Sequence, residues 1–255
     1  MLLLLSPAKK LDYDSPVRTS LHSEPLFMES ASGLIDVLKK KSVSQVAALM
    51  DLSDKLALLN AGRYASWTPR SDRTSSRQAA LAFNGDVYQG LGAASLSDAQ
   101  LKWAQDHVVI LSGLYGVLRP LDLIRPYRLE MGTRLATHKG HTLYSYWGPT
   151  IAHYLNERLQ KQRRPLVLNL ASEEYFKSVD LKTLRAPVAH CIFQDFKNGT
   201  WKVISFHAKK ARGLMARFVI EKRIGSVAGL KAFSAGGYAF DAGQSTDSRL
   251  VFKRS

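Results

Sequence analysis

Short apolar runs recur along the chain at wide intervals, and stretches with helical spacing of apolar residues lie between them. Runs of about four to eight apolar residues bounded by turn residues are typical of buried β-strands. The runs predicted to be strands are Leu2–Leu5, His107–Leu111, Pro165–Leu170, Val188–Phe196 and Leu250–Phe252. Because strands and helices alternate without a strict rhythm, we expect a single α+β domain over residues 1–255, with a mixed β-sheet and surrounding helices.

The composition and the apolar runs bound the class of protein. With 255 residues, 45% of them hydrophobic, the chain can bury a sizeable core. No apolar run approaches the roughly 18 residues of a membrane span, and the opening run Met1–Leu5 is too short for a signal peptide. No glycine-rich dinucleotide fingerprint, phosphate loop, repeat or linker is present. We therefore expect a cytoplasmic protein without a membrane partner.

The charge is the feature that bears most on function. Lys and Arg number 36 against 21 Asp and Glu, which gives a formal net charge of +15. A charge of this size raises the local concentration of polyanions around a protein but says nothing about its fold. Nucleic acid is therefore one candidate partner, and the equal alternative is that some bacterial enzymes are simply basic. The distribution of the charges has to separate these two interpretations.

Cys191 is the only cysteine, which excludes an intramolecular disulfide and a cluster of thiolate ligands. Its apolar neighbours in Val188–Phe193 predict an inert, buried thiol, since a reactive cysteine needs accessible and electropositive surroundings. His138 and His141 share a loop, but no third ligand follows at a metal-binding spacing. We therefore expect neither a metal nor a cofactor.

The segment His207–Ile224 is predicted to be a long helix, and it carries the sharpest charge pattern. Its apolar arc comprises Ala211, Leu214, Met215 and Phe218, and its cationic arc Lys209, Lys210, Arg212, Arg217 and Arg223. Gly213 lies between the cations and would let a backbone approach closely. Because a surface of one sign repels itself unless an anion neutralises it, we interpret this arc as a phosphate-contacting face. The alternative is charge without a partner.

A second basic cluster lies in Arg119–Gly132, a proline-containing segment that is predicted to be non-helical. Its arginines are Arg119, Arg125 and Arg128. Arginine binds phosphate bidentately, and Tyr127 between two arginines could stack on a base. Asp122 and Glu130 are close by, so an arginine–carboxylate lattice is an equal alternative.

Two short helical patterns flank Leu49–Ala57, which is similar to the hairpin of helix-hairpin-helix DNA-binding elements. That hairpin has the pattern Leu-Pro-Gly-Ile-Gly-Pro-Lys-Thr-Ala, and its backbone N–H groups meet a phosphate. The apolar positions, Lys55 and Ala57 match it, whereas Asp51 and Ser53 replace the two glycines. A plain helical hairpin is the alternative.

Other candidates are isolated. Lys9 and Lys10 follow the first predicted strand, where a rigid element aims a loop, although a solvated strand end would look the same. The candidates for acid–base or pocket roles are Glu130, Glu173 and Glu174, with Lys177, Asp86 and Tyr88. The spacing of Glu173 and Lys177 is also that of ordinary helix pairing.

Several blocks of sequence point to a known family. They are Leu4–Lys9, Phe83–Tyr88, Leu111–Asp122, Pro126–Gly132, Asn169–Lys177 and Ala208–Phe218, and the match continues to Leu250–Arg254. Together they resemble the YaaA family of bacterial peroxide-stress proteins over essentially the whole chain. The resemblance implies a cytosolic protein, induced by hydrogen peroxide, that limits iron-dependent damage and is associated with DNA binding. It also implies an α+β fold with a basic cleft and a helix-hairpin-helix-like element.

Two hypotheses follow. The favoured one is a DNA-binding protein of the peroxide stress response that holds duplex or distorted DNA largely independently of sequence. The predicted nucleic-acid contacts are Lys9, Lys10, Ser53, Lys55, Arg119, Arg125, Arg128, Lys177, Lys209, Lys210, Arg212 and Arg217. The alternative is an enzyme acting on a nucleic-acid base, a nucleotide or another phosphorylated substrate in the same cleft, without an assigned catalytic residue.

Overall fold

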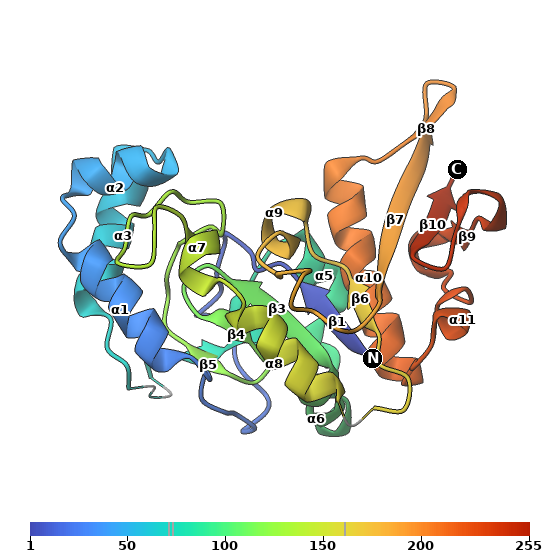
Figure 1. The fold of residues 1–255 in the computed structure, drawn as a ribbon, viewed down its shortest axis with the longest axis horizontal. Coiled ribbons are helices and arrows are strands. Elements are labelled where there is room, and N and C mark those ends of the chain that lie inside the picture. The colour runs from blue at the N-terminus through green and yellow to red at the C-terminus, as the bar shows by residue number, and fades with distance from the viewer. Residues whose placement is uncertain (71, 73, 161) are drawn as a thin grey trace.

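A mixed β-sheet forms the centre of the protein (Figure 1). The computed structural model describes residues 1–70, 72, 74–160 and 162–255, and within them the sheet has eight strands, ordered β4-β3-β1-β6-β7-β10-β9 with β8 paired to β7. The parallel strands are β1 (Leu2–Leu5), β3 (Val108–Ser112), β6 (Val167–Asn169), β7 (Val188–Lys197) and β10 (Arg249–Arg254). The antiparallel strands are β4 (Gly116–Leu118), β8 (Thr200–Lys202) and β9 (Ala239–Phe240). The predicted mixed sheet is confirmed.

The connection that follows β1 leads toward one edge of the sheet, and the connection that follows β6 leads toward the other edge. The chain passes from β1 to its neighbour β3 on one side, and from β6, on the other side of β1, to β7. Where the direction of connection reverses, the loops beyond the carboxyl ends of the two strands diverge and leave a crevice. The fold therefore predicts a ligand site beyond the carboxyl ends of β1 and β6.

Helices pack against the sheet and also build one end of the molecule. The longer ones are α1 (Met28–Lys39), α2 (Val43–Met50), α3 (Asp54–Ser66), α6 (Asp98–His107), α8 (Thr150–Leu159) and α10 (Ser205–Lys222). The shorter ones are α4 (Ala79–Ala82), α5 (Asp86–Leu91), α7 (Leu143–Trp147), α9 (Glu173–Phe176) and α11 (Val227–Leu230). In Figure 1, α1, α2 and α3 lie together at the end opposite β10 and α11. A small sheet of β2 (Arg77–Gln78) and β5 (Leu123–Ile124) completes the fold.

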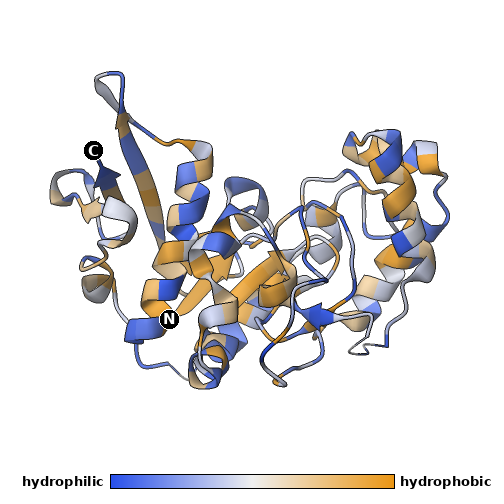
Figure 2. Ribbon diagram, turned by 180° about the vertical axis from the view of Figure 1, so that it is seen from behind, coloured by the Kyte–Doolittle hydropathy of each residue, from blue (hydrophilic) through white to orange (hydrophobic). Residues whose placement is uncertain are grey.

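The core follows the apolar runs of the sequence. Leu2–Leu5 are at most 1% exposed, and Figure 2 shows the central strands as predominantly hydrophobic. Along β7 the side chains of Ala189, Cys191 and Phe193 are buried while the residues between them are half-buried, as the alternation of a strand requires. Within the described residues, no helix is both long enough and apolar enough to cross a membrane.

The helices α5 and α10 cross with their backbones almost in contact. A Cβ atom added to Gly213 of α10 would overlap the carbonyl oxygen of Val87 and lie 2.8 Å from the nitrogen of Leu91, both in α5. A Cβ atom added to Gly90 of α5 would likewise overlap the carbonyl oxygen of Lys210. The backbone that approaches Gly213 is thus that of α5, and two glycines set the position of α10.

The predicted burial of Cys191 is confirmed, and it leads to a prediction about the reactivity of the thiol. Cys191 is 5% exposed, and desolvation raises the pKa of its thiol far above the ordinary value. Because the thiolate is the reactive form, we expect the native protein to react with Ellman's reagent only on the timescale of unfolding. In urea the exposed thiol should react at once and release one equivalent of thionitrobenzoate per chain. Rapid reaction of the native protein would contradict the buried position.

Candidate functional site

A cavity of about 600 Å³ lies beyond the carboxyl ends of β1 and β6, where the reversal of the connections predicts one. Loops from widely separated parts of the chain line it. These are Ser6–Lys10 after β1, Phe83–Tyr88 before and in α5, Tyr127–Glu130, Ser172–Tyr175 after β6, and Lys209 and Arg212 of α10. Asp86 and Tyr88, which the sequence suggests as pocket residues, are among them.

Hydrogen bonds fix the loops of the cavity to one another. The Oγ of Ser6 accepts a bond of 2.8 Å from the backbone N–H of Ser172, so the two strand ends are joined directly. The Tyr88 hydroxyl donates to the carbonyl oxygen of Ser6 at 3.0 Å, and the N–H of Asn84 donates to that of Lys10 at 2.9 Å. The cavity wall is therefore preformed, which lowers the entropic cost of binding.

Two cations of the cavity share one carboxylate. The Oε1 of Glu130 lies 3.2 Å from Nζ of Lys9 and 2.9 Å from Nη2 of Arg128. The hydroxyl of Tyr64 in α3 also donates to the carbonyl oxygen of Arg128, which holds this loop from the other side. The Lys9 side chain remains 70% exposed, so it keeps N–H donors for a further partner.

Arg212 is the cation of the cavity that differs from the others. Within the described residues its guanidinium takes part in no hydrogen bond and no ion pair, although the residue is half-buried. Desolvation lowers its pKa, and the nearby Cys191 thiol opposes that shift. A partly desolvated charge without a partner is unfavourable, and a bound anion would remove that cost. Lys209, one turn earlier, lines the same cavity.

The cavity also carries negative charge. The Oε1 of Glu174 accepts a hydrogen bond of 2.9 Å from the backbone N–H of Gly132, which fixes this carboxylate in place. For Glu130 and Glu174, the second oxygen, Oε2, takes part in no hydrogen bond within the described residues. The site therefore offers cationic donors together with uncommitted carboxylate acceptors.

The structure brings together five of the twelve predicted contact residues. Lys9, Lys10, Arg128, Lys209 and Arg212 line the cavity, whereas Ser53, Lys55, Arg119, Arg125, Lys177, Lys210 and Arg217 do not. Ser53 is the N-cap residue of α3, and Lys55, Lys177 and Lys210 are exposed. Nζ of Lys177 lies 5.6 Å from the centroid of the Tyr144 ring.

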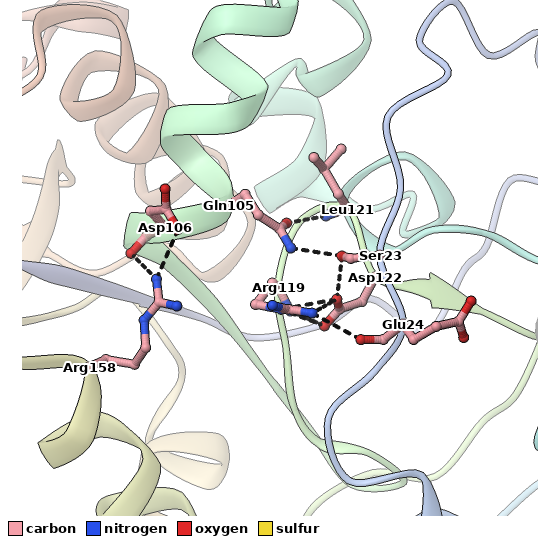
Figure 3. Close-up of polar contacts among 8 residues, drawn as sticks. All are labelled: Ser23, Glu24, Gln105, Asp106, Arg119, Leu121, Asp122 and Arg158. Carbon is pink, nitrogen blue, oxygen red and sulfur yellow. Dashed lines mark hydrogen bonds and ion pairs between the residues drawn. The ribbon is translucent and has the colours of Figure 1, made fainter.

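All three arginines of the Arg119–Gly132 cluster pair with a carboxylate, as the arginine–carboxylate alternative predicts, and Arg119 and Arg125 do so outside the cavity. Arg119 donates through Nη2 to the buried carboxylate of Asp122 at 2.8 Å and to the carbonyl oxygen of Glu24 at 2.9 Å (Figure 3). Arg125 donates to Asp72 at 2.9 Å. Their guanidinium groups are thus engaged within the protein rather than free for phosphate.

The helical-wheel interpretation of α10 needs a correction. Nη1 of Arg217 donates to the carbonyl oxygens of Leu91 and Gly92, both at 3.1 Å, and to Oγ of Ser95 at 2.8 Å, and its Nε lies 2.8 Å from Glu221. Arg217 therefore closes the carboxyl end of α5 and does not lie on a free cationic face. The wheel fails because it cannot show that α5 covers the side of α10 that contains Gly213.

Tyr127 also differs from its predicted role. It is 5% exposed, its hydroxyl lies 2.6 Å from Oγ of Ser112, and its ring packs edge-on against Tyr115. It forms part of the cavity wall instead of a projecting platform for a base. Sequence reasoning missed Ser6 and Ser172, although a serine soon after each of two buried strands is a signal that could have found them.

Comparisons with known proteins agree with the resemblance of this sequence to the YaaA family. The family model of the peroxide stress protein YaaA matches residues 1–244. A UPF0246 protein of Bordetella petrii is 65% identical over 100% of this chain and 99% of its own length, and one of Bordetella pertussis is 63% identical over the same shares. A UPF0246 protein of Albidiferax ferrireducens is 58% identical over 100% of this chain and 98% of its own. The chain therefore belongs to the family of the peroxide stress protein YaaA.

Proposed function

We propose that the protein binds DNA during peroxide stress, duplex or distorted and largely independently of sequence. The observation that carries this proposal is the guanidinium of Arg212, which makes no hydrogen bond or ion pair within the described residues and shares one cavity with four lysine and arginine side chains from two other segments and its own helix. Although Lys9 and Arg128 share the carboxylate of Glu130, cations that converge in this way suit phosphates, and counterion release then supplies most of the affinity. Membership of a peroxide-stress family supports the setting.

The turn between α2 and α3 is a second phosphate contact in this proposal. Asp51 has a left-handed φ of 51°, the conformation for which the usual hairpin has glycine, and the Ser53 side chain makes no capping hydrogen bond. Within the described residues, the first N–H groups of α3 therefore have no side-chain acceptor, and such groups are suited to an oxygen of a phosphate. Lys55, exposed in the first turn of α3, adds positive charge beside them.

The proposal also covers iron-dependent damage, through the cations that DNA binds. Duplex DNA holds a condensed layer of cations, and a protein that neutralises phosphates displaces cations from that layer. Ferrous ions displaced in this way would react with peroxide away from the bases. We propose that this displacement is how the protein limits iron-dependent damage.

The test is the salt dependence of binding to a short duplex, measured by fluorescence anisotropy. The variant carrying Lys209→Gln and Arg212→Gln should lose about two units of the slope of log K against log salt, because each phosphate contact contributes about one. Lys102→Gln is the matched control, since Lys102 is an exposed cation of α6 outside the cavity. Its slope should equal that of the wild type. An unchanged slope in the double variant would overturn the proposed interface.

A second candidate function is an enzyme that acts on a nucleotide or a nucleic-acid base. The observation that favours it is that Glu130 and Glu174 line the same cavity as the cations, with Nζ of Lys9 3.2 Å from Glu130. A carboxylate beside an amine can transfer protons to and from a bound substrate. A DNA contact that used phosphates alone would have no need of these carboxylates.

A further inference from the structure

The size and position of the cavity limit which part of a nucleic acid can enter it. A volume of about 600 Å³ lies within the range of small-molecule sites, roughly 300–1,000 Å³, and is too small to enclose a duplex. Its place beyond the carboxyl ends of β1 and β6 is where open parallel sheets bind nucleotides. A single nucleotide fits both constraints.

The walls of the cavity have two chemistries. Arg212 and Lys209 of α10 supply cationic donors, which suit a phosphate. Glu130 and Glu174 supply acceptors whose Oε2 atoms make no hydrogen bond within the described residues. A phosphate has no use for these acceptors, whereas the amino groups of a base or the hydroxyl of a sugar donate to them.

The remaining lining combines apolar and aromatic residues with polar and charged ones such as Lys10, Asp86 and Glu173. Phe83, Tyr88, Tyr127 and Tyr175 line the cavity, and the ring centroids of Phe83 and Tyr88 lie 5.2 Å apart. Aromatic walls accommodate the face of a base, which is planar and apolar. In a paired strand, however, both the face and the pairing edge of a base are covered, so a base reaches such a wall only after it leaves the stack.

We infer that this cavity binds one nucleotide unit, with its phosphate against Arg212 and Lys209 and its base between the aromatic wall and the carboxylates of Glu130 and Glu174. The unit is either a nucleotide turned out of a DNA strand or a free nucleoside monophosphate. The inference rests on the proposed function only for the first of these sources. The inference adds to the proposed function that the cavity contacts a base as well as a phosphate.

The experiment uses the fluorescence of 2-aminopurine, which is quenched in the stack and recovers when the base leaves it. One arm places 2-aminopurine opposite an abasic position in a duplex, and the other uses free 2-aminopurine deoxyriboside monophosphate. Anisotropy of a separate dye on the duplex reports binding independently of the base. We expect the full-length protein to raise the 2-aminopurine signal of the duplex several-fold at saturation.

The variants separate base binding from phosphate binding. Arg212→Gln should weaken the fluorescence response in both arms, whereas Lys210→Gln, an exposed cation of the same helix outside the cavity, should leave it unchanged. Glu174→Gln keeps an oxygen for the N–H of Gly132 but loses the charge. It should weaken nucleotide binding about fivefold, since a charged acceptor makes the stronger bond. A site for phosphate alone predicts the opposite, tighter binding.

Each outcome decides one point. A rise with the duplex supports a nucleotide turned out of a strand, and saturable binding in the second arm alone supports a free nucleotide. Anisotropy showing DNA binding, with no response in either arm, would overturn the nucleotide site while leaving the proposed function intact. Absence of DNA binding at low salt would overturn the proposed function, and the free-nucleotide arm would still test the cavity.

Discussion

Replacement of Gly213 by alanine is expected to destabilise the protein by at least about 3 kcal/mol, the upper end of overpacking effects. The added Cβ would overlap the carbonyl oxygen of Val87, a backbone atom that no side-chain rotation can move. The helices α5 and α10 would have to separate, and Arg217 would lose its contacts with the carboxyl end of α5. Urea unfolding followed by circular dichroism measures the change, as a lower midpoint at an unchanged slope.

Gly62 provides the matched control. It lies within α3, and a Cβ added there would meet no atom of the described residues within 4 Å. Gly62→Ala should therefore raise the free energy of unfolding by about 0.5–1 kcal/mol, because glycine is unfavourable inside a helix. If Gly213→Ala shifted the midpoint in the same direction, the close crossing of α5 and α10 would be refuted. Gly90→Ala, which faces the same crossing from α5, should behave like Gly213→Ala.

The second large effect is expected from Asp122→Ala, with a loss of about 3–5 kcal/mol. The carboxylate of Asp122 is fully buried, and it accepts from the backbone N–H of Arg119 at 2.8 Å, from the Arg119 guanidinium and from the Ser23 hydroxyl at 2.6 Å (Figure 3). Desolvation raises the pKa of this carboxyl, and the bonds from Arg119 and Ser23 oppose the shift. Its removal leaves the mostly buried Arg119 guanidinium without a counter-charge.

Asp106 provides an exposed carboxylate–arginine pair for comparison with the buried pair of Asp122 and Arg119. Its carboxylate lies 3.3 Å from Nη2 of Arg158, and its side chain is 69% exposed (Figure 3). Asp106→Ala should cost less than about 1 kcal/mol, because exposed ion pairs contribute little in water. Thermal or urea unfolding of the two variants side by side gives the comparison. Similar losses in both would mean that the burial of Asp122 does not determine its contribution.

The parallel strands of the central sheet were predictable because their buried apolar runs leave a local signal. Leu2–Leu5 is an unbroken apolar run, Pro165–Leu170 is interrupted only by Asn169, and each contains a strand of the central sheet. The order of the strands was not predictable. Leu3 pairs with Val108 on one side and with Leu168 on the other, and nothing in four leucines specifies partners so far along the chain. The reversal that creates the cavity depends on that order.

The candidate site was predictable only in part, for a related reason. The sequence identifies arginines, but it does not show which of them are engaged within the protein. Arg119 pairs with a carboxylate three positions away, Arg217 pairs with Glu221 and with carbonyl oxygens of α5, and Arg212 makes no hydrogen bond or ion pair within the described residues. These three residues look alike in sequence, and their surroundings in the fold separate the structural arginines from the one that remains open to a ligand.

The cavity takes its cations from positions as far apart as Lys9 and Arg212, and this spacing has a consequence for the protein as it is made. At about 5–20 residues per second, a ribosome needs roughly 10–40 s to pass from the first to the second. During this interval β1 is an apolar segment whose two partner strands are synthesised later, first β3 and then β6. A nascent chain that ends before α10 carries Lys9 and Lys10 but has no site. The cavity is thus completed only near the end of translation.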